Sequence, residues 1–295
     1  MTDKKLNKAT AVALGNFDGL HSGHISVLQN ALSFKEKGYV PTVILFDVHP
    51  REFVLKSLVK RLVTSCETEQ RLVSMGFEIY KISFAQIREM TPREFFEKII
   101  VGKLNAKAVC CGFNYSFGKN GQGNSETIKE LCAQSDVICT VSDEITVDGK
   151  SVSSTEIKNY LLNGQPEKAA KMIGRNYSFT SKVIHGDARG RELGFPTINQ
   201  TLDSSLIVPK FGVYQSIVIV DGEKYSGVTN IGVRPTYLSD VVLAETNILD
   251  FSKDIYGEDV TVELVKYIRE ERKFDSAQSL ISQLETDVKQ VSRDV

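Results

Sequence analysis

The sequence predicts an α/β domain followed by a smaller β domain. From the start to about residue 160, apolar strand-like runs alternate with amphipathic helical stretches. This alternation is typical of a mostly parallel sheet with helices on both faces. Beyond Gly164-Gln165-Pro166, successive strand-like segments and one C-terminal helix follow. We therefore expect a parallel-sheet domain over residues 1–165 and a small antiparallel β-barrel with a C-terminal helix over 166–295.

The elements of the first domain follow from their apolar patterns. The strand candidates are 10–14, 40–47, 78–83, 107–111 and 136–141. The helix candidates are 23–37, 67–75, 92–103, 125–134 and 154–162. In sheets of this kind ligands bind outside the carboxyl ends of the strands. Polar motifs follow 10–14, 40–47 and 107–111, so we expect a binding site at that edge.

The second domain has a different pattern. Its strand candidates are 177–185, 211–221, 224–233, 243–249 and 259–268. Asp221-Gly222 separates two of these strands and is a strong signal for a two-residue hairpin. The segment from 276 to about 291 carries an apolar stripe at helical spacing, made of Leu280, Ile281, Leu284 and Val288. A helical connection near 156–173 is expected to join the two domains.

Composition excludes several classes of protein. The 295 residues carry a net charge of −1 and a pI near 6.5, which argues against sequence-independent binding to nucleic acid. No apolar run reaches membrane-spanning length, and the polar start of the chain is unlike a signal peptide. The cysteines, at 66, 110, 111, 132 and 139, fit no zinc spacing and are expected to be reduced and mostly buried. We expect a cytoplasmic enzyme.

The segment from Gly15 to His24 is the most informative part of the chain. It follows a buried-strand pattern and precedes a helical one, so its glycines allow close backbone approach and the helix start suits a phosphate. A glycine-rich strand-to-helix turn with a histidine near the helix cap is the structural alternative. We favour function, because Asp18, His21 and His24 together cost burial of polar groups without a packing benefit.

Three further segments of the first domain carry polar motifs. Phe46-Asp47-Val48-His49-Pro50 ends a strand, and a simple strand-ending turn explains it equally well. Gly112 to Lys119 follows the next long strand; it is not a P-loop, because one residue too many precedes Gly118-Lys119 and Asn120 replaces Ser or Thr. Ser153 and Glu156 form a capping-box pattern at a helix start, which is compatible with phosphate binding.

In the second domain, Gly186 to Asn199 is the strongest motif. It combines three glycines and two arginines around a turn with the sequence Pro-Thr-Ile-Asn, which is more than a basic, solvated hairpin needs. Thr229 to Thr236 and Glu245 to Phe251 are further candidates. Taken alone, Glu245 is equally consistent with a charge on a strand face.

These motifs resemble those of the bacterial bifunctional riboflavin kinase/FAD synthetase family, in the same order and over nearly the whole chain. Gly15 to His24 resembles its G-x-F-D-G-x-H-x-G-H signature, and Gly190 to Asn199 resembles its G-R-x-L-G-F-P-T-A-N pattern. The resemblance implies a Rossmann-like nucleotidyltransferase domain over 1–165 and a riboflavin kinase domain over 166–295. It also implies ATP and flavins as substrates and Mg²⁺ as cofactor.

The resemblance assigns roles in adenylyl transfer to specific residues. His21 and His24 are the catalytic hydrogen-bond donors. The implied ATP-binding residues are Gly15, Phe17, Asp18, Gly19, Ser154, Thr155 and Lys158. The implied flavin-binding residues are Asp47, His49, Asn114, Tyr115 and Phe117. This chain has Val48 where the family has proline and Lys158 where it has arginine, and a lysine lacks the bidentate fork of a guanidinium.

In the kinase domain the resemblance makes Glu245 the general base. The implied ATP-binding residues are Gly186, Gly190, Arg191, Gly194, Pro196, Thr197 and Asn199. Thr197 and Asn199 are also the implied metal ligands. The chain departs from the family at Ile198, where an alanine is usual, and at Asn247, where a histidine is usual.

The predicted function is phosphorylation of riboflavin to FMN and adenylylation of FMN to FAD, each with ATP. The partners are these small molecules, with no nucleic acid and no membrane, and the sequence leaves the oligomeric state open. Two alternatives are an adenylyltransferase with a weakened kinase domain and a non-catalytic flavin- or nucleotide-binding regulatory protein.

Overall fold

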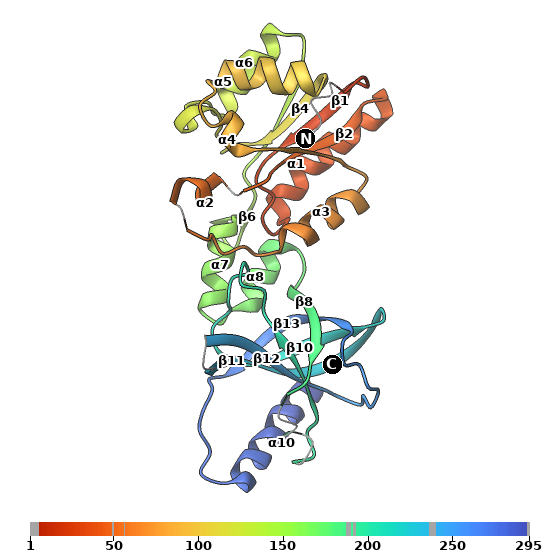
Figure 1. Ribbon diagram of the computed structural model, residues 1–295, viewed down its shortest axis with the longest axis vertical. Helices are drawn as coiled ribbons and strands as arrows, with labels where there is room; N and C mark the ends of the chain where they lie inside the picture. Colours follow the sequence, from red (N-terminus) through yellow and green to blue (C-terminus); the bar gives the residue numbers. More distant parts are fainter. Residues whose placement is uncertain are drawn as a thin grey trace. The chain divides into compact units, whose positions relative to one another are not determined.

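The computed structural model describes residues 6–48, 50–55, 57–186, 190, 193–235 and 240–293. Internal contacts divide the chain into two compact units, Met1–Ser154 and Thr155–Val295. Each unit has its own sheet system (Figure 1). The domain boundary after residue 165 stays a prediction.

The first unit contains a five-stranded parallel sheet in the order β3-β2-β1-β4-β5. Its strands are β1 (Thr10–Leu14), β2 (Val40–Phe46), β3 (Glu78–Ile82), β4 (Ala106–Gly112) and β5 (Ile138–Ser142). All neighbouring strands pair in parallel. The order reverses direction next to β1, so β1 and β4 lie at the point where such sheets open a crevice for ligands.

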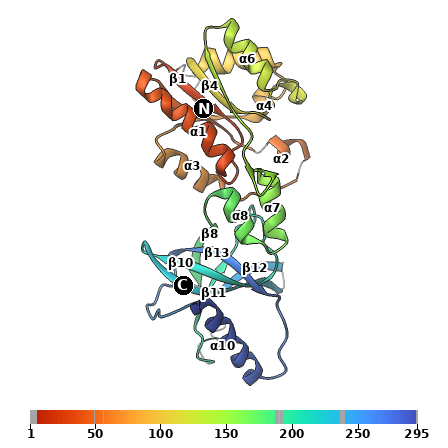
Figure 2. The same cartoon turned by 180° about the vertical axis from the view of Figure 1, so that it is seen from behind.

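Both faces of this sheet are covered, as predicted. Ala11 and Ala13 of β1 belong to one hydrophobic cluster, whereas Val12 and Leu14 belong to another. Successive residues of a strand point to opposite faces, so each cluster is the core of one layer. Figures 1 and 2 show α1 and α3 on one side of the sheet and the helices around α6 on the other.

The helices of this unit are α1 (Ser22–Ser33), α2 (Pro50–Leu55), α3 (Ser65–Ser74), α4 (Phe84–Ile87), α5 (Pro92–Phe95) and α6 (Ser125–Gln134). A 3₁₀ turn, η1 (Phe34–Lys37), follows α1 and a π-helical segment, η2 (Phe96–Lys103), follows α5. The predicted helices 23–37 and 92–103 are therefore each composite. A short 3₁₀ turn η3 (Lys119–Gly121) and the strands β6 (Thr146–Val147) and β7 (Lys150–Ser151) complete the unit.

The chain continues through α7 (Ser154–Leu162) and α8 (Pro166–Ile173), the predicted helical connection. The second unit is a closed antiparallel barrel in the order β10-β11-β12-β9-β8-β13. Its strands are β8 (Tyr177–Ile184), β9 (Thr197–Thr201), β10 (Gly212–Val220), β11 (Glu223–Pro235), β12 (Asp240–Ile248) and β13 (Asp259–Arg269). The hairpin at Asp221-Gly222 is confirmed: both residues have positive φ, 51° and 84°, and Val220 pairs with Glu223.

The barrel has a polar line inside and a helix outside. The hydroxyls of Ser216, Thr229 and Thr246 form a buried chain, with oxygen separations of 2.7 and 2.9 Å. On the outer face, α10 (Ala277–Arg293) packs Val288 and Val291 against residues of β10 and β11. The predicted C-terminal helix is thus confirmed.

Sequence reasoning missed the short elements α2, α4, η3, β6, β7 and β9 and was otherwise accurate to within a few residues. No strand was predicted over Thr197–Thr201, which is short and polar; its pairing with β8 and β12 makes it a strand. The cysteines are free thiols; Cys110, Cys111 and Cys132 are buried, Cys139 is partly buried and Cys66 is exposed.

Candidate active sites

The loop between β1 and α1 is held in a tight, partly strained conformation. Phe17 and Leu20 have positive φ, 52° and 45°, and both side chains are buried. Gly19 also has a positive φ, 85°, and a Cβ there would lie 2.6 Å from Leu62. Strain of this kind persists only where surrounding packing enforces it, and it gathers at functional sites.

The two histidines of this loop form one unit. His21 is the N-cap of α1, and its Nδ1 accepts the backbone N–H of His24 at 3.4 Å. The rings stack with centroids 3.7 Å apart and an angle of 19°. Because Nδ1 of His21 is an acceptor, a neutral His21 carries its proton on Nε2. Nδ1 of His24 is buried and has no hydrogen-bond partner among the described residues.

Both imidazoles are neutral at pH 7. Burial lowers the pKa of His21 to about 4. Burial, and to a smaller extent the neighbouring His21, lowers the pKa of His24 well below its usual value. Each neutral ring has one N–H to donate. Without a ligand, the pair therefore offers hydrogen-bond donors but carries no positive charge.

Asp18 and Phe17 support this loop from inside. The Asp18 carboxylate accepts the backbone N–H of Leu62 at 2.7 Å, and its carbonyl accepts the Ser154 hydroxyl at 2.9 Å. Phe17 is fully buried, with its ring 5.4 Å from that of His24. The structure thus brings Ser154 to the loop, whereas Phe17 is placed to support His24 from the core. Thr155 and Lys158 lie on the first turns of α7.

A cavity of about 270 Å³ lies at the carboxyl ends of β1 and β2. Asp18 and Asp47 both line it, so the structure brings together residues from two predicted motifs. Its further lining residues are Asn16, Leu45, Phe46, Pro50, Arg61, Val63, Ser65, Thr68, Glu69 and Lys81. Sequence reasoning missed the cations Arg61 and Lys81, because neither lies in a recognisable motif and only folding brings them to this edge.

Asp47 has a structural task at this edge. Its carboxylate accepts the backbone N–H groups of Val48 and Phe84 at 2.8 and 3.0 Å. Burial acts to raise its pKa, but these hydrogen bonds and one from Ser83 outweigh it and hold the pKa below its ordinary value. Asp47 therefore ties the end of β2 to the start of α4. His49 lies outside the described residues.

The aromatic residues after β4 divide between core and surface. The rings of Tyr115 and Phe117 stack with centroids 5.5 Å apart, and both pack on the hydrophobic cluster around η2 and α6. Asn114 and Phe113 are exposed at the end of the same strand. The freely accessible ring is therefore that of Phe113, at 40% exposure, which the motif comparison did not select.

In the second unit, strand register gathers the predicted kinase residues. Glu245 of β12 lies directly opposite Asn199 of β9 on one side and Asn230 of β11 on the other. Thr197 lies opposite Asn247, two residues along the same strands. Side chains of directly opposite residues share one face of a sheet. Their neighbours Thr229 and Thr246 point into the barrel, so this row, Asn199-Glu245-Asn230, lies on the outer face.

Two glycines of the preceding loop lie against these side chains. A Cβ on Gly186 would collide with the Asn199 amide, and one on Gly190 would collide with the Phe195 carbonyl and lie 3.3 Å from the Thr197 hydroxyl. The backbone N–H of Phe195 closes the loop onto the Gly190 carbonyl at 2.8 Å. Gly194 has a φ of 84°, and Pro196 is exposed. Arg191 lies outside the described residues.

The structure gives physical accounts of the two departures from the family pattern in the kinase domain. The Asn247 amide donates to the Pro196 carbonyl at 2.7 Å, so it fixes the segment that carries Thr197. Ile198 lies opposite the fully buried Thr246, on the opposite face of β9 from Thr197 and Asn199. Its extra bulk is therefore directed toward the barrel interior rather than toward the row of polar side chains.

Comparison with known families agrees with this division into two sites. Residues 3–156 match the model of the FAD synthetase family, and residues 173–295 match the riboflavin kinase family. A Bacillus subtilis protein, bifunctional riboflavin kinase/FMN adenylyltransferase, is 35% identical over 98% of this chain and 94% of its own length. The chain belongs to this bifunctional family.

Other relatives carry the same name. The Listeria monocytogenes protein is 35% identical over 97% of this chain and 92% of its own length. The Escherichia coli K12 protein is 31% identical over 94% of this chain and 90% of its own length. The family expected from the motifs is therefore confirmed, and so is the order of its two domains.

A solved structure shares the whole two-domain fold. The crystal structure of a Streptococcus pneumoniae protein named macrolide-efflux protein superposes with a TM-score of 0.89 and 31% identity, over 99% of this chain and 96% of that one. The name belongs to that protein. In the described part of this chain, no helix is both long enough and apolar enough to cross a membrane.

Proposed function

We propose that this chain phosphorylates riboflavin to FMN and adenylylates FMN to FAD, consuming ATP in both steps. The first reaction is assigned to the barrel and the second to the parallel-sheet unit. The observation that carries the proposal is the pairing of two separate polar sites with the two family models. One is the stacked, neutral histidine pair at the start of α1; the other is the Asn199-Glu245-Asn230 row.

In adenylyl transfer, the FMN phosphate attacks the α-phosphorus of ATP in line and pyrophosphate leaves. This step needs no covalent enzyme intermediate, so the protein acts by positioning and by stabilising charge. Nε2–H of His21 and the N–H of His24 are the donors to the ATP phosphates. The N-terminus of α1 adds its dipole, and Gly15 and Gly19 allow the triphosphate to approach the backbone.

In the kinase reaction, Glu245 accepts the proton of the ribityl hydroxyl that attacks the γ-phosphorus of ATP. An exposed carboxylate is suited to this role because it can reach a bound hydroxyl and accept its proton. Asn199 on the neighbouring strand binds ATP, so register alone places the base beside the phosphate donor. Gly186, Gly190 and Gly194 allow the loop backbone to cover the nucleotide.

The residues present fit a Mg²⁺ ion bound jointly with ATP. Thr197 and Asn199 offer hydroxyl and amide oxygens, the hard ligands that Mg²⁺ takes, and the glycines beside them leave room for a ligand. Among the described residues no group of three His, Cys, Asp or Glu side chains could hold a metal by itself. Phosphate oxygens would thus complete the coordination, and the ion would neutralise charge on the transferred phosphoryl group.

The alternatives raised by the sequence are a chain with a weakened kinase and a non-catalytic regulatory protein. Two departures that motivated them, Ile198 and Asn247, are accommodated without disturbing the polar row. Retention of Glu245, Thr197, Asn199, His21 and His24 supports the bifunctional proposal. A cytoplasmic location, where ATP and flavins are available, completes it.

The direct test incubates the purified chain with ATP, Mg²⁺ and either riboflavin or FMN, and separates the flavins by chromatography. We expect FAD from both substrates. Glu245→Gln should abolish FMN formation and spare FAD formation from FMN, whereas His24→Ala should do the reverse. FAD from FMN alone would support the weakened kinase, and tight flavin binding without products would support the regulatory protein.

A further inference from the structure

Glu271 reaches the outer face of the barrel beside the proposed kinase base. It follows β13 by two residues, and its Oε1 accepts a hydrogen bond from Nδ2 of Asn230 at 3.0 Å. Asn230 lies directly opposite Glu245. The row on this face therefore extends from Asn199 through Glu245 and Asn230 to Glu271.

Gly232 provides the space that Glu271 occupies. It lies two residues after Asn230 on β11 and so shares its face. The three atoms nearest to a Cβ placed on Gly232 all belong to the Glu271 carboxyl group, and Oε1 would collide with it. The absence of a side chain at Gly232 therefore leaves room for the Glu271 carboxylate. A side chain at position 232 would displace this carboxylate from Asn230.

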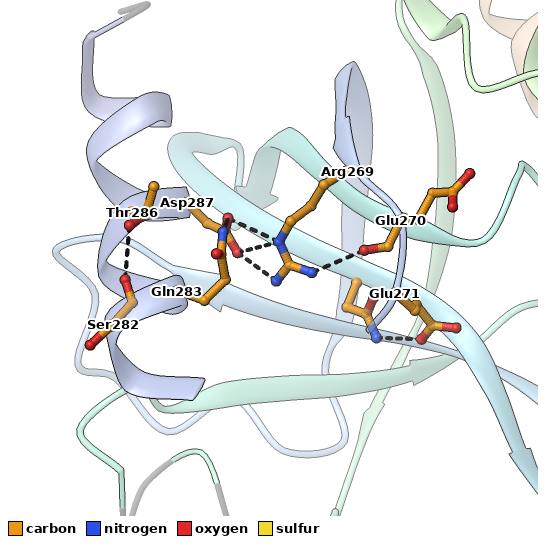
Figure 3. Close-up of polar contacts among 8 residues, drawn as sticks. Arg269, Glu270, Glu271, Ser282, Gln283, Thr286 and Asp287 are labelled. Atoms are coloured by element: carbon orange, nitrogen blue, oxygen red, sulfur yellow. Dashed lines mark hydrogen bonds and ion pairs between the residues drawn. The ribbon is translucent and has the colours of Figure 1, made fainter. Parts of the chain in front are cut away.

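The backbone that carries Glu271 is anchored to α10 (Figure 3). Nε of Arg269 lies 3.1 Å from both carboxylate oxygens of Asp287, and Nη2 lies 2.7 Å from Oδ2. Nη1 of Arg269 donates to the Glu270 carbonyl at 3.0 Å, which belongs to the peptide unit joining Glu270 to Glu271. Asp287 is 1% exposed and also accepts from Gln283 at 2.7 Å.

The adjacent carboxylate, Glu270, has a different partner. It pairs with Lys210 at 2.9 Å and does not share the contact with Asn230. Two consecutive glutamates therefore differ in one respect that matters here: only Glu271 bonds to a residue of the polar row. This makes Glu270 a matched control for the charge and exposure of Glu271.

We propose that Glu271 is a positioning residue of the kinase site. By accepting one N–H of Asn230, it fixes the plane of that amide, which lies directly opposite Glu245 in the register of β11 and β12. A fixed amide limits the orientations of the neighbouring carboxylate and keeps it aimed at the attacking hydroxyl. The inference rests on the proposed function, because it assumes that Glu245 is the base.

The test measures kcat and KM of riboflavin phosphorylation, with FMN adenylylation in the same preparation as internal control. Misplacement of a catalytic group costs on the order of 10- to 100-fold in rate, so Glu271→Ala should lower kcat by that factor and change the riboflavin KM far less. Glu271→Gln should retain more activity, because its amide oxygen can still accept from Asn230. Glu270→Gln should leave both constants near wild type.

A double-mutant cycle separates positioning from general structural damage. Gly232→Ala should lower kcat about as much as Glu271→Ala, because it displaces the same carboxylate. The double variant Gly232→Ala/Glu271→Ala should be no slower than either single variant, because the collision is then removed. Losses that multiply would contradict the proposal and indicate two unrelated defects.

The outcomes distinguish this inference from the proposed function. If Glu245→Gln abolishes kinase activity and Glu271→Ala leaves kcat unchanged, only the positioning role of Glu271 is wrong. If the Glu245→Gln variant retains kinase activity, both the role of Glu245 as base and the positioning role of Glu271 are rejected. Equal losses from Glu270→Gln and Glu271→Ala also reject the proposal, since charge alone would then explain the effect.

Discussion

At the scale of single residues, the two sites use burial in opposite ways. His21 is 6% exposed and neutral, so it is a hydrogen-bond donor without a positive charge. Glu245 is exposed, so a bound hydroxyl can reach its carboxylate. Burial prevents a permanent charge at the histidine pair, whereas the glutamate is open to solvent. In the proposed mechanism, one chain thereby provides neutral donors in one unit and an exposed base in the other.

The buried histidines make the stability of the first unit depend on pH. The pKa of His21 is near 6.5 when unfolded and about 4 when folded, so the unfolded state binds more protons between these values. Stability should therefore fall as the pH drops from about 6.5 and level off near 4, with a contribution from His21 of about 3 kcal/mol.

His21→Asn tests this dependence. Asparagine is a good N-cap and can accept the His24 N–H, but it does not titrate. We expect urea denaturation curves between pH 7 and pH 4 to show a shallower loss of stability in this variant, and adenylyl transfer to fail. An unchanged pH dependence would exclude His21 as its source.

At the scale of elements, a loop and a strand build the proposed nucleotide face of the barrel. Gly186 approaches the Asn199 amide so closely that the cheapest response to an added methyl group is rotation of that amide. Gly186→Ala should therefore reduce kinase kcat/KM for ATP by on the order of 100-fold with little loss of stability. Adenylyl transfer in the same sample serves as control, and normal kinase kinetics would show that Asn199 does not bind ATP.

The attachment of α10 is the second element-level feature. The Arg269–Asp287 pair is bidentate, and its carboxylate is buried. Removing one partner leaves the other partly buried and unpaired, at a cost of about 3–5 kcal/mol. Asp287→Ala should lower the unfolding midpoint of the barrel in urea and impair the kinase. Exposed pairs such as Lys182–Asp259 contribute little, so Asp259→Ala is the control that should leave the midpoint nearly unchanged.

At the scale of the whole molecule, each unit has its own hydrophobic interior. Leu28 and Leu264 are both fully buried, the first in the core beside α1 and the second inside the barrel. Leu→Ala in a core costs about 2–5 kcal/mol. Leu28→Ala should lower the temperature of half-inactivation of adenylyl transfer by about 10 °C and spare the kinase; Leu264→Ala should do the reverse. Simultaneous loss of both activities in either variant would show that the units unfold together.

Periodicity was enough to predict most of the fold. All strands of the parallel sheet and nearly all of the barrel were predicted within a few residues, because apolar runs and their alternation depend on local sequence. The short polar strand Thr197–Thr201 could not be predicted, because its identity as a strand comes from its neighbours β8 and β12. The helices 23–37 and 92–103 were predicted as continuous, and each is composite in the structure.

The sequence by itself determined the family and the order of the two domains, and it predicted the residues suited to phosphate and proton chemistry. These depend on residue type and spacing, which are written in the chain. Tertiary structure alone decided that His21 and His24 stack and stay neutral, that Glu245 lies between Asn199 and Asn230, and that Glu271 reaches Asn230 over Gly232. Each of these depends on burial or on strand register, which join residues far apart in sequence and exist only in the folded chain.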